Sequence, residues 1–213
     1  MSVRFNNEEF NKLKKLLPIY EWALQLLTTK LNIIHQDLIN TSDSSAIEYI
    51  RSRIKSPESI AQKLSNLNLE LTAESARANL TDIAGARIIC PFTNDIHKVV
   101  ELLRALPDVK IIREKDYVNN PKPSGYRSYH VIVEVPVFFG SGQENVPLEL
   151  QIRTEAMNFW ASLEHKTKYK FKGAVPAYIA ERLESISYRL IGLDDEMLQI
   201  YNLVNRANGE KRL

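Results

Sequence analysis

The segment from Leu148 to Thr154 alternates strictly between apolar and polar side chains, and this pattern constrains the fold more than any other. Leucine or isoleucine stands at 148, 150 and 152, and the positions between and after them hold Glu149, Gln151 and Arg153. Successive side chains of a strand point to opposite faces, so a period of two predicts a β-strand with one buried face. The other face then presents a row of polar groups.

Strand and helix signals alternate through the middle of the chain. Strands are predicted at 84–92, 109–113, 131–139 and 146–153, and helices at 95–106 and from Glu155 to about Tyr169. Residues 140–142, Gly-Ser-Gly, indicate a turn, and Thr154 is expected to cap the last of these helices. This order predicts an α/β (α+β) fold, in which a mixed sheet is covered by helices on at least one face.

Both ends of the chain carry apolar residues in steps of three and four, which predicts long terminal helices. The N-terminal series is Tyr20, Leu24, Leu27, Leu31, Ile34 and Leu38, and the C-terminal series is Ile179, Leu183, Ile186, Leu190, Leu193, Met197, Ile200 and Val204. Each stripe can pack within the chain or on another subunit. Two stripes are more than one modest domain usually needs, which favours oligomerisation. We expect a helical extension at 1–45, a core at 46–172 and a C-terminal helix at 173–213.

Composition excludes several classes of protein. A net charge of +2 over 213 residues is too small to indicate RNA or DNA binding by itself. The single cysteine, Cys90, excludes an internal disulfide and a Cys-rich metal site. The charged N-terminus has no apolar signal segment, and no apolar run approaches the length of a membrane span. We therefore expect a cytoplasmic protein that binds no membrane.

The first constellation of polar residues surrounds a helix start at Ser56-Pro57, with serine as N-cap and proline at the first helical position. Its cations and hydroxyl are Arg53, Lys55, Ser59 and Lys63. Free backbone N–H groups next to these side chains form a site suited to polyphosphate. The alternative is a capped surface helix with solvated lysines.

The second constellation is Asp82-Ile-Ala-Gly-Ala-Arg87, at the mouth of a predicted strand. A carboxylate in this position can hold Mg²⁺, and the guanidinium of Arg87 can stack on a base or pair with phosphate. Alternatively, Asp82 caps a turn and Arg87 pairs with a structural carboxylate.

The third constellation joins the polar strand face to the loop 122–130. Tyr126 and Tyr129 offer stacking surfaces, Lys122 and Arg127 offer phosphate contacts, and Gly125 permits a tight turn. On the strand, Glu149 could accept a proton from a sugar hydroxyl, share a metal with Asp82, or do both. Asn158, on the following helix, carries an amide suited to a base edge. Such a group suits a nucleotide, although a half-buried strand beside a polar loop would look the same.

Five motifs in this order closely resemble the RelA/SpoT synthetase domain, between about Arg53 and Lys170. They are Arg53-x-Lys55-x-x-x-Ser59-x-x-x-Lys63, Asp82-Ile-Ala-Gly-Ala-Arg87, Gly125-Tyr-Arg-Ser-Tyr-His130, Glu149-Leu-Gln-Ile-Arg-Thr154 and Met157-Asn158-Phe-Trp160-Ala-Ser-Leu-Glu164-His165. Any one of them would be weak, and the five together are specific. With short helical flanks, the chain resembles a stand-alone small alarmone synthetase.

The resemblance implies a nucleotidyltransferase-like fold and the transfer of pyrophosphate from ATP to the 3′-hydroxyl of GTP or GDP, which makes the (p)ppGpp of the stringent response. It implies that Arg53 and Arg87 sandwich adenine, that Lys55, Ser59 and Lys63 hold the donor phosphates, and that Asp82 binds Mg²⁺. On the acceptor side it implies Tyr126 on guanine, Lys122 near phosphate, His130 supporting the loop, Gln151 beside Glu149, and Asn158 on the nucleoside. Glu149 would activate the hydroxyl, complete the metal site, or do both.

The resemblance also bears on regulation and on rival functions. None of the four histidines precedes an aspartate, the pair that the hydrolase site of longer relatives uses, so we expect synthesis without hydrolysis. Members of this size commonly form homotetramers through their terminal helices. Some are stimulated by a bound alarmone, and the 69–75 insertion favours the less stimulated branch. The rival readings are a catalytically silent nucleotide sensor and an RNA-binding protein; intact Asp82 and Glu149 argue against the first.

Overall fold

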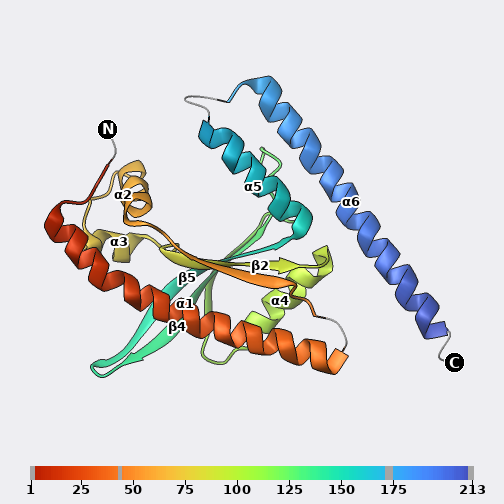
Figure 1. The fold of residues 1–213 in the computed structure, drawn as a ribbon, viewed down its shortest axis with the longest axis horizontal. Coiled ribbons are helices and arrows are strands. Elements are labelled where there is room, and N and C mark those ends of the chain that lie inside the picture. The colour runs from red at the N-terminus through yellow and green to blue at the C-terminus, as the bar shows by residue number, and fades with distance from the viewer. Residues whose placement is uncertain (1–2, 43–44, 171–174, 211–213) are drawn as a thin grey trace.

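The computed structural model describes residues 3–42, 45–170 and 175–210 (Figure 1). Within these residues one five-stranded sheet has the order β1-β2-β5-β4-β3. Its strands are β1 (Tyr49–Ile54), β2 (Ala84–Cys90), β3 (Lys110–Asp116), β4 (Tyr129–Phe139) and β5 (Gly142–Thr154). Strands β2 and β5 run parallel and the other neighbours antiparallel, so the expected mixed sheet is confirmed.

The helices of the described residues are α1 (Asn7–Ser42), α2 (Pro57–Asn66), α3 (Ala73–Asn79), α4 (Thr93–Ala105), α5 (Glu155–Lys170) and α6 (Ala177–Glu210). Ser56 caps α2 by accepting a hydrogen bond from the Ser59 N–H, and Thr154 caps α5 by accepting one from the Met157 N–H, as the sequence predicts. The long terminal helices are present as predicted. The expected division between residues 172 and 173 lies outside the described residues.

The hydrophobic core lies between the apolar face of the sheet and two helices, α1 and α4. It includes Leu27 and Leu31 of α1, Val99 of α4, and Leu150 and Ile152 of β5. The apolar face predicted from the alternation in β5 is therefore the buried one. The other face carries the polar side chains, and α5 packs over part of it at β2 and β5 (Figure 1).

The apolar stripes of the two terminal helices differ in how far they are buried. In the N-terminal stripe, Tyr20, Leu24, Leu27 and Leu31 are buried against the sheet, so this stripe packs within the chain. Helix α6 lies beside α5 along its first half and then extends past the end of α5 (Figure 1). Its distal stripe, Leu193, Met197, Ile200 and Val204, is 47–57% exposed. None of the helices in the described part of the chain combines the length and apolar content that a membrane crossing requires.

Candidate active site

The register of the sheet aligns polar residues from all five strands on one face. One row across the sheet contains Arg51, Arg87, Gln151, His130 and Lys115, and the adjacent row contains Arg53, Gly85, Glu149 and Ile132. Residues paired in register point to the same face of a sheet. Residues far apart in the sequence therefore meet on the face opposite the core.

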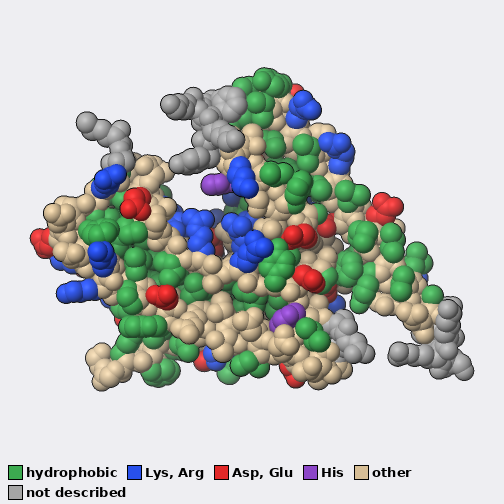
Figure 2. All heavy atoms as spheres, viewed as in Figure 1, with side chains coloured by type: hydrophobic (Ala, Val, Ile, Leu, Met, Phe, Trp, Pro, Cys, Tyr) green, Lys and Arg blue, Asp and Glu red, His purple; other side chains and the backbone are tan. Residues whose placement is uncertain are grey.

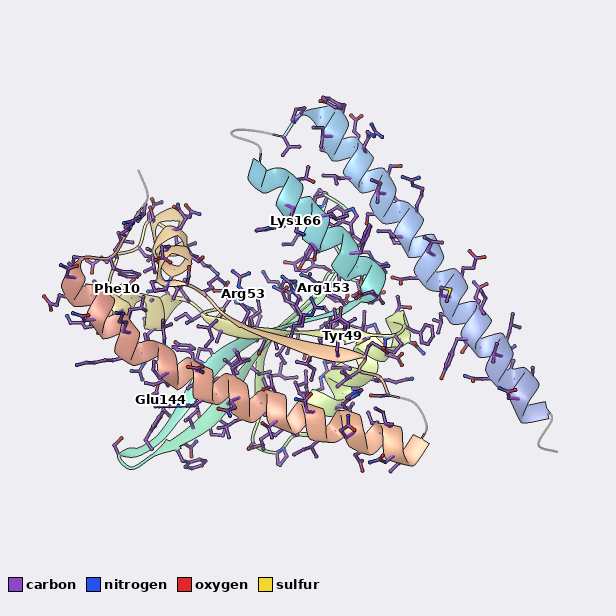
Figure 3. All side chains as sticks on the ribbon, viewed as in Figure 1. Phe10, Tyr49, Arg53, Glu144, Arg153 and Lys166 are labelled. Carbon is purple, nitrogen blue, oxygen red and sulfur yellow. The ribbon has the colours of Figure 1, made fainter. Side chains whose placement is uncertain are left out.

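A cavity of about 440 Å³ opens over β1, β2 and β5. Its lining includes Arg51, Arg53 and Lys55 from β1 and the turn after it, Asp82 before β2, Arg87 on β2, and Glu149 and Gln151 on β5. Figure 2 shows Lys and Arg side chains gathered in a hollow near the centre of this view. In Figure 3, Arg53 and Arg153 lie above the sheet, in the part of the view between α2 and α5. The concentration of positive charge suits a phosphate-bearing ligand.

Asp82 ties the two lysines of the first constellation together. Its Oδ2 atom accepts from Lys55 Nζ at 2.7 Å and from Lys63 Nζ at 2.5 Å. Burial raises the pKa of this carboxyl group, but the two lysine hydrogen bonds lower it by more, so the net shift is downward. Its Oδ1 atom is buried and has no hydrogen-bond partner in the described structure. Asp82 is therefore a carboxylate at neutral pH with one buried oxygen that no described group hydrogen-bonds.

Glu149 lies between the residues expected to bind ATP and those expected to bind GTP or GDP. Its Oε2 atom accepts from Gln151 Nε2 at 3.0 Å, and its Oε1 atom lies 3.3 Å from His130 Nδ1. Burial raises the pKa of Glu149, but the hydrogen bond and charge of His130 and the hydrogen bond from Gln151 outweigh this effect, so the pKa is lowered. The group is ionised at neutral pH and close to Asp82, whose charge opposes that shift.

A second cavity, of about 220 Å³, lies on the other side of Glu149. It is lined by Arg113, Glu114, Lys115, Tyr117, Lys122, His130, Ile132 and Glu149. Lys122 Nζ lies 4.7 and 4.8 Å from the ring centres of Tyr117 and Tyr126. The Tyr126 hydroxyl and His130 Nε2 are 2.7 Å apart. Glu149 thus belongs to the walls of both cavities.

Arg153 is a functional candidate that the sequence interpretation did not include in the site. Arg153 is 3% exposed, and its guanidinium donates to the Tyr126 hydroxyl at 2.5 Å, to Gln151 Oε1 at 2.6 Å and to Ser128 Oγ at 3.2 Å. Burial lowers its pKa. The alternation along the strand could have indicated it, because Arg153 lies on the same face as Glu149 and Gln151. Arg51, Arg113 and Lys115 are further cavity residues not predicted from the sequence.

Five predicted site residues are absent from both cavity linings: Ser59, Lys63, Tyr126, Arg127 and Asn158. The Tyr126 hydroxyl contacts His130, which lines the second cavity. Arg127 turns toward α6: its Nε donates to the Val118 carbonyl at 3.2 Å, and Asp194 and Asp195 act on its charge. The neighbouring Tyr126 side chain instead contacts His130 and Arg153, a difference that adjacency in the sequence does not indicate. Asn158 lies on α5, and its Oδ1 atom is buried without a hydrogen-bond partner in the described residues. Ser59 and Lys63 lie on α2, and Lys63 reaches the first cavity through Asp82.

The described residues contain no group of three or more His, Cys, Asp or Glu side chains that could hold a metal ion. A divalent ion here would therefore use the two carboxylates and oxygens from a substrate. Mg²⁺ commonly binds in this way, through one or two carboxylates plus phosphate and water. The unpartnered Oδ1 of Asp82 fits such an ion.

A five-stranded mixed sheet flanked by helices, with two carboxylates and rows of cations lining two cavities, agrees with the nucleotidyltransferase-like fold expected from the sequence. The sequence profile described as the region found in RelA/SpoT proteins matches residues 52–174, more than half of the chain. The chain therefore belongs to the RelA/SpoT family, and its relatives place it among the small alarmone synthetases.

The similarity to these relatives extends over nearly the whole chain. This chain is 44% identical over 187 residues to the GTP pyrophosphokinase YwaC of Bacillus subtilis, and the match covers 88% of this chain and 89% of the relative. It is 38% identical over 194 residues to the GTP pyrophosphokinase YjbM of the same organism, covering 91% and 90%. The crystal structure of small alarmone synthetase 1 from Bacillus subtilis, bound to its product pppGpp, superposes with a TM-score of 0.84 at 38% identity, covering 91% of this chain and 98% of that one.

Proposed function

We propose that the protein transfers the β,γ-pyrophosphate of ATP to the ribose 3′-hydroxyl of GTP or GDP, giving pppGpp or ppGpp and releasing AMP. The observation that carries this proposal is the position of Glu149 in the walls of both cavities. A transfer between two nucleotides needs two adjoining pockets and a proton acceptor where they meet. The names of the two Bacillus relatives, and the product bound in the crystal structure of small alarmone synthetase 1, support the same reaction.

The donor nucleotide, ATP, binds in the larger cavity. Arg53 and Arg87 stand on adjacent antiparallel strands, where two planar guanidinium groups can hold adenine between them. Lys55 and Lys63 bind the phosphates, together with Ser59 in the first turn of α2. In the described structure both lysines bind Asp82, so the phosphates would share these cations with the carboxylate.

The acceptor nucleotide binds in the smaller cavity. Tyr126 stacks on guanine, and Lys122, already positioned over the Tyr117 and Tyr126 rings, contacts the acceptor phosphates. His130 holds both the Tyr126 hydroxyl and Glu149, so it links the base-binding group to the reacting group. Gln151 orients the other oxygen of Glu149. Asn158, with its unpartnered Oδ1, contacts the nucleoside from α5.

The reaction requires one proton acceptor and charge neutralisation. The 3′-oxygen of the acceptor forms a bond to the β-phosphorus of ATP as its proton passes to Glu149. The bond between the β-phosphorus and the oxygen that bridges it to the α-phosphorus breaks, and AMP leaves with that oxygen. Lys55 and Lys63 neutralise the negative charge that develops on the transferred group.

Asp82 and Glu149 are the residues that would hold Mg²⁺. The ion, when bound, would neutralise phosphate charge and orient the transferred group for in-line attack. The free oxygen of Asp82 supports this assignment. The two lysines lower the pKa of Asp82, so its carboxyl group is ionised at neutral pH, as a metal ligand must be.

The assembly we propose is a cytoplasmic homotetramer held by the terminal helices. The exposed distal stripe of α6 supports it, since four large apolar residues on one stripe of this helix remain 47–57% exposed in the described chain. The N-terminal stripe is buried within the chain and contributes less than its sequence pattern indicates. We propose a cytoplasmic location because the proposed substrates, ATP and GTP, are abundant there.

The test is to incubate the purified protein with Mg²⁺, ATP labelled at the β-phosphate, and either GTP or GDP, and to separate the nucleotides. We expect the label on a more highly charged guanosine nucleotide, with AMP formed in equal amount. The acceptor that reacts faster identifies the preferred substrate. Absence of product with both acceptors would contradict the proposed function.

A further inference from the structure

Helix α6 contacts the acceptor side of the site through three hydrogen bonds on one stripe, one made by a backbone carbonyl of α6 and two by its polar side chains. The carbonyl of Leu183 accepts from Trp160 Nε1 at 2.8 Å, Ser187 Oγ donates to the Gly125 carbonyl at 2.6 Å, and Asp194 Oδ2 accepts from Thr154 Oγ1 at 2.7 Å. Spacings of four and seven residues place positions 183, 187 and 194 on the same side of a helix. The same helix leaves most of its other residues exposed.

The contact between Ser187 and Gly125 is closely fitted on both sides. Ser187 is 5% exposed and is the one buried residue of α6 among those whose side chains the structure describes. Gly125 has a φ of +86°, which favours glycine, and a Cβ added there would lie 2.7 Å from Ser187 Cβ. The small side chain of Ser187 therefore packs directly against Gly125, where any larger residue would clash.

Gly125 is in the turn that carries the proposed acceptor-binding residues. Its N–H donates to the Lys122 carbonyl at 2.8 Å, and the Lys122 N–H donates to the Tyr126 carbonyl at 3.1 Å. These two bonds fix Lys122 and Tyr126 relative to Gly125. A bond that holds the Gly125 carbonyl consequently sets the position of both residues.

The contact at Asp194 supports the loop from a second direction. Thr154, fully buried at the end of β5, donates to Asp194 and also caps α5. Asp194 acts electrostatically on Arg127, which in turn donates to the carbonyl of Val118 on the other arm of the loop. Asp194 thus stands between the end of the strand that carries Glu149 and the loop that carries Tyr126.

We propose that Ser187 and Asp194 are positioning residues that hold the 122–130 loop in the shape required to bind the acceptor nucleotide. The inference rests on the proposed function, because it takes Tyr126 and Lys122 as acceptor-binding residues. A loop held in its binding conformation before the ligand arrives loses less conformational entropy on binding. Neither residue touches a substrate, and their influence passes through Gly125 and Arg127.

The test compares Ser187→Ala and Asp194→Asn with Ser185→Ala, which makes the same change at an exposed serine of α6. We expect the KM for GDP to rise about three- to tenfold in each of the first two variants, as for the loss of one buried hydrogen bond or charge contact. The KM for ATP, measured at saturating GDP, should stay at the wild-type value. Ser185→Ala should match wild type in both.

A direct binding measurement separates this inference from the proposed function. Equilibrium dialysis gives the affinity for GDP without ATP, and it needs no turnover. A wild-type protein that makes no alarmone would contradict the proposed function alone. The positioning role would be overturned if Ser187→Ala bound GDP as tightly as Ser185→Ala, or if the KM for ATP rose in parallel with that for GDP, since a purely structural contact would disturb both sites.

Discussion

At Glu149 burial and hydrogen bonding act in opposite directions on the same carboxyl group. Burial raises its pKa, and the bonds to His130 and Gln151 lower it by more. The lowered pKa keeps the group ionised at neutral pH, as a proton acceptor and a metal ligand both must be. A weakly basic carboxylate is still effective when it is held against the reacting hydroxyl, because the hydroxyl loses its proton only as the new bond forms.

The first prediction concerns the charge of Glu149. Glu149→Gln keeps the size of the side chain but removes its charge and basicity. We expect kcat to fall at least 100-fold, on the order of magnitude of a lost general base. Steady-state assays over a range of Mg²⁺ concentrations check this. Glu134→Gln, the same change on the neighbouring strand and outside both cavity linings, should retain activity.

The dependence on Mg²⁺ distinguishes the two roles of Glu149. If activity falls and the Mg²⁺ concentration for half-maximal rate is unchanged, the carboxylate acts mainly on the proton. If high Mg²⁺ restores the rate, it acts mainly on the metal. Activity equal to wild type at every Mg²⁺ concentration would contradict both roles.

The second prediction concerns pH. Because hydrogen bonding to His130 lowers the pKa of Glu149, the ionised form persists to lower pH than the usual value of 4.5 allows. His130→Ala removes this bond, so the pKa rises and the acid limb of the kcat/KM profile should move to higher pH. The profile is measured for both proteins over the range in which each remains folded. An acid limb that does not move would show that His130 does not control the ionisation of Glu149.

At the scale of the element, strand β2 depends on a glycine where it meets β5. A Cβ at Gly85 would lie 2.1 Å from the backbone oxygen of Glu149, its partner in the parallel pairing. The two backbones can approach this closely only without a side chain at Gly85. The same glycine lines the first cavity and leaves room above the sheet.

The third prediction follows from this close approach. Gly85→Ala should lower the free energy of unfolding by about 1–3 kcal/mol, as overpacking of a filled site does, and should reduce turnover by moving Glu149. Urea denaturation and the transfer assay measure the two effects. The control is Gly140→Ala, where an added Cβ has no neighbour within 4 Å. Equal unfolding free energies for the two variants would contradict the prediction.

Most helices and strands could be predicted because each carries its own local signal. Alternation marked β5, the Ser56-Pro57 pair marked the start of α2, and Thr154 marked the start of α5. Strand β1 was missed because Arg51, Ser52 and Arg53 are all exposed at the edge of the sheet, which leaves no period of two to detect. Helix α3, with seven residues, is too short for a helical period.

The site could be predicted less completely than the fold. The motifs predicted Asp82 and Glu149 as site residues, and both line the first cavity. Arg153 was missed because its role comes from a contact with Tyr126, 27 positions away in the sequence. Arg127 was assigned to phosphate because it is a cation of the 122–130 loop, whereas its surroundings are set by α6, whose position no local pattern encodes.

At the scale of the whole molecule, the distal half of α6 determines assembly in our proposal. The fourth prediction is that Met197→Glu combined with Ile200→Glu separates the homotetramer into smaller species, because burying unpaired charge in an apolar contact is costly. Sedimentation velocity of wild type and variant at equal concentration measures this. Asn202→Glu adds a charge on the other side of the same helix and should leave assembly unchanged. A wild-type protein that sediments as a monomer would contradict the proposed assembly.

The wall that the two cavities share has a thermodynamic consequence for the molecule as a whole. Glu149 lines both cavities, so in the proposed function a nucleotide in either cavity would alter the electrostatic field at a residue that the other nucleotide contacts. Linkage requires that whatever factor ATP applies to the affinity for the guanine nucleotide, the guanine nucleotide applies to the affinity for ATP. If the two nucleotides bind as proposed, any coupling that passes through this one carboxylate makes the occupancy of each cavity depend on the concentrations of both nucleotides.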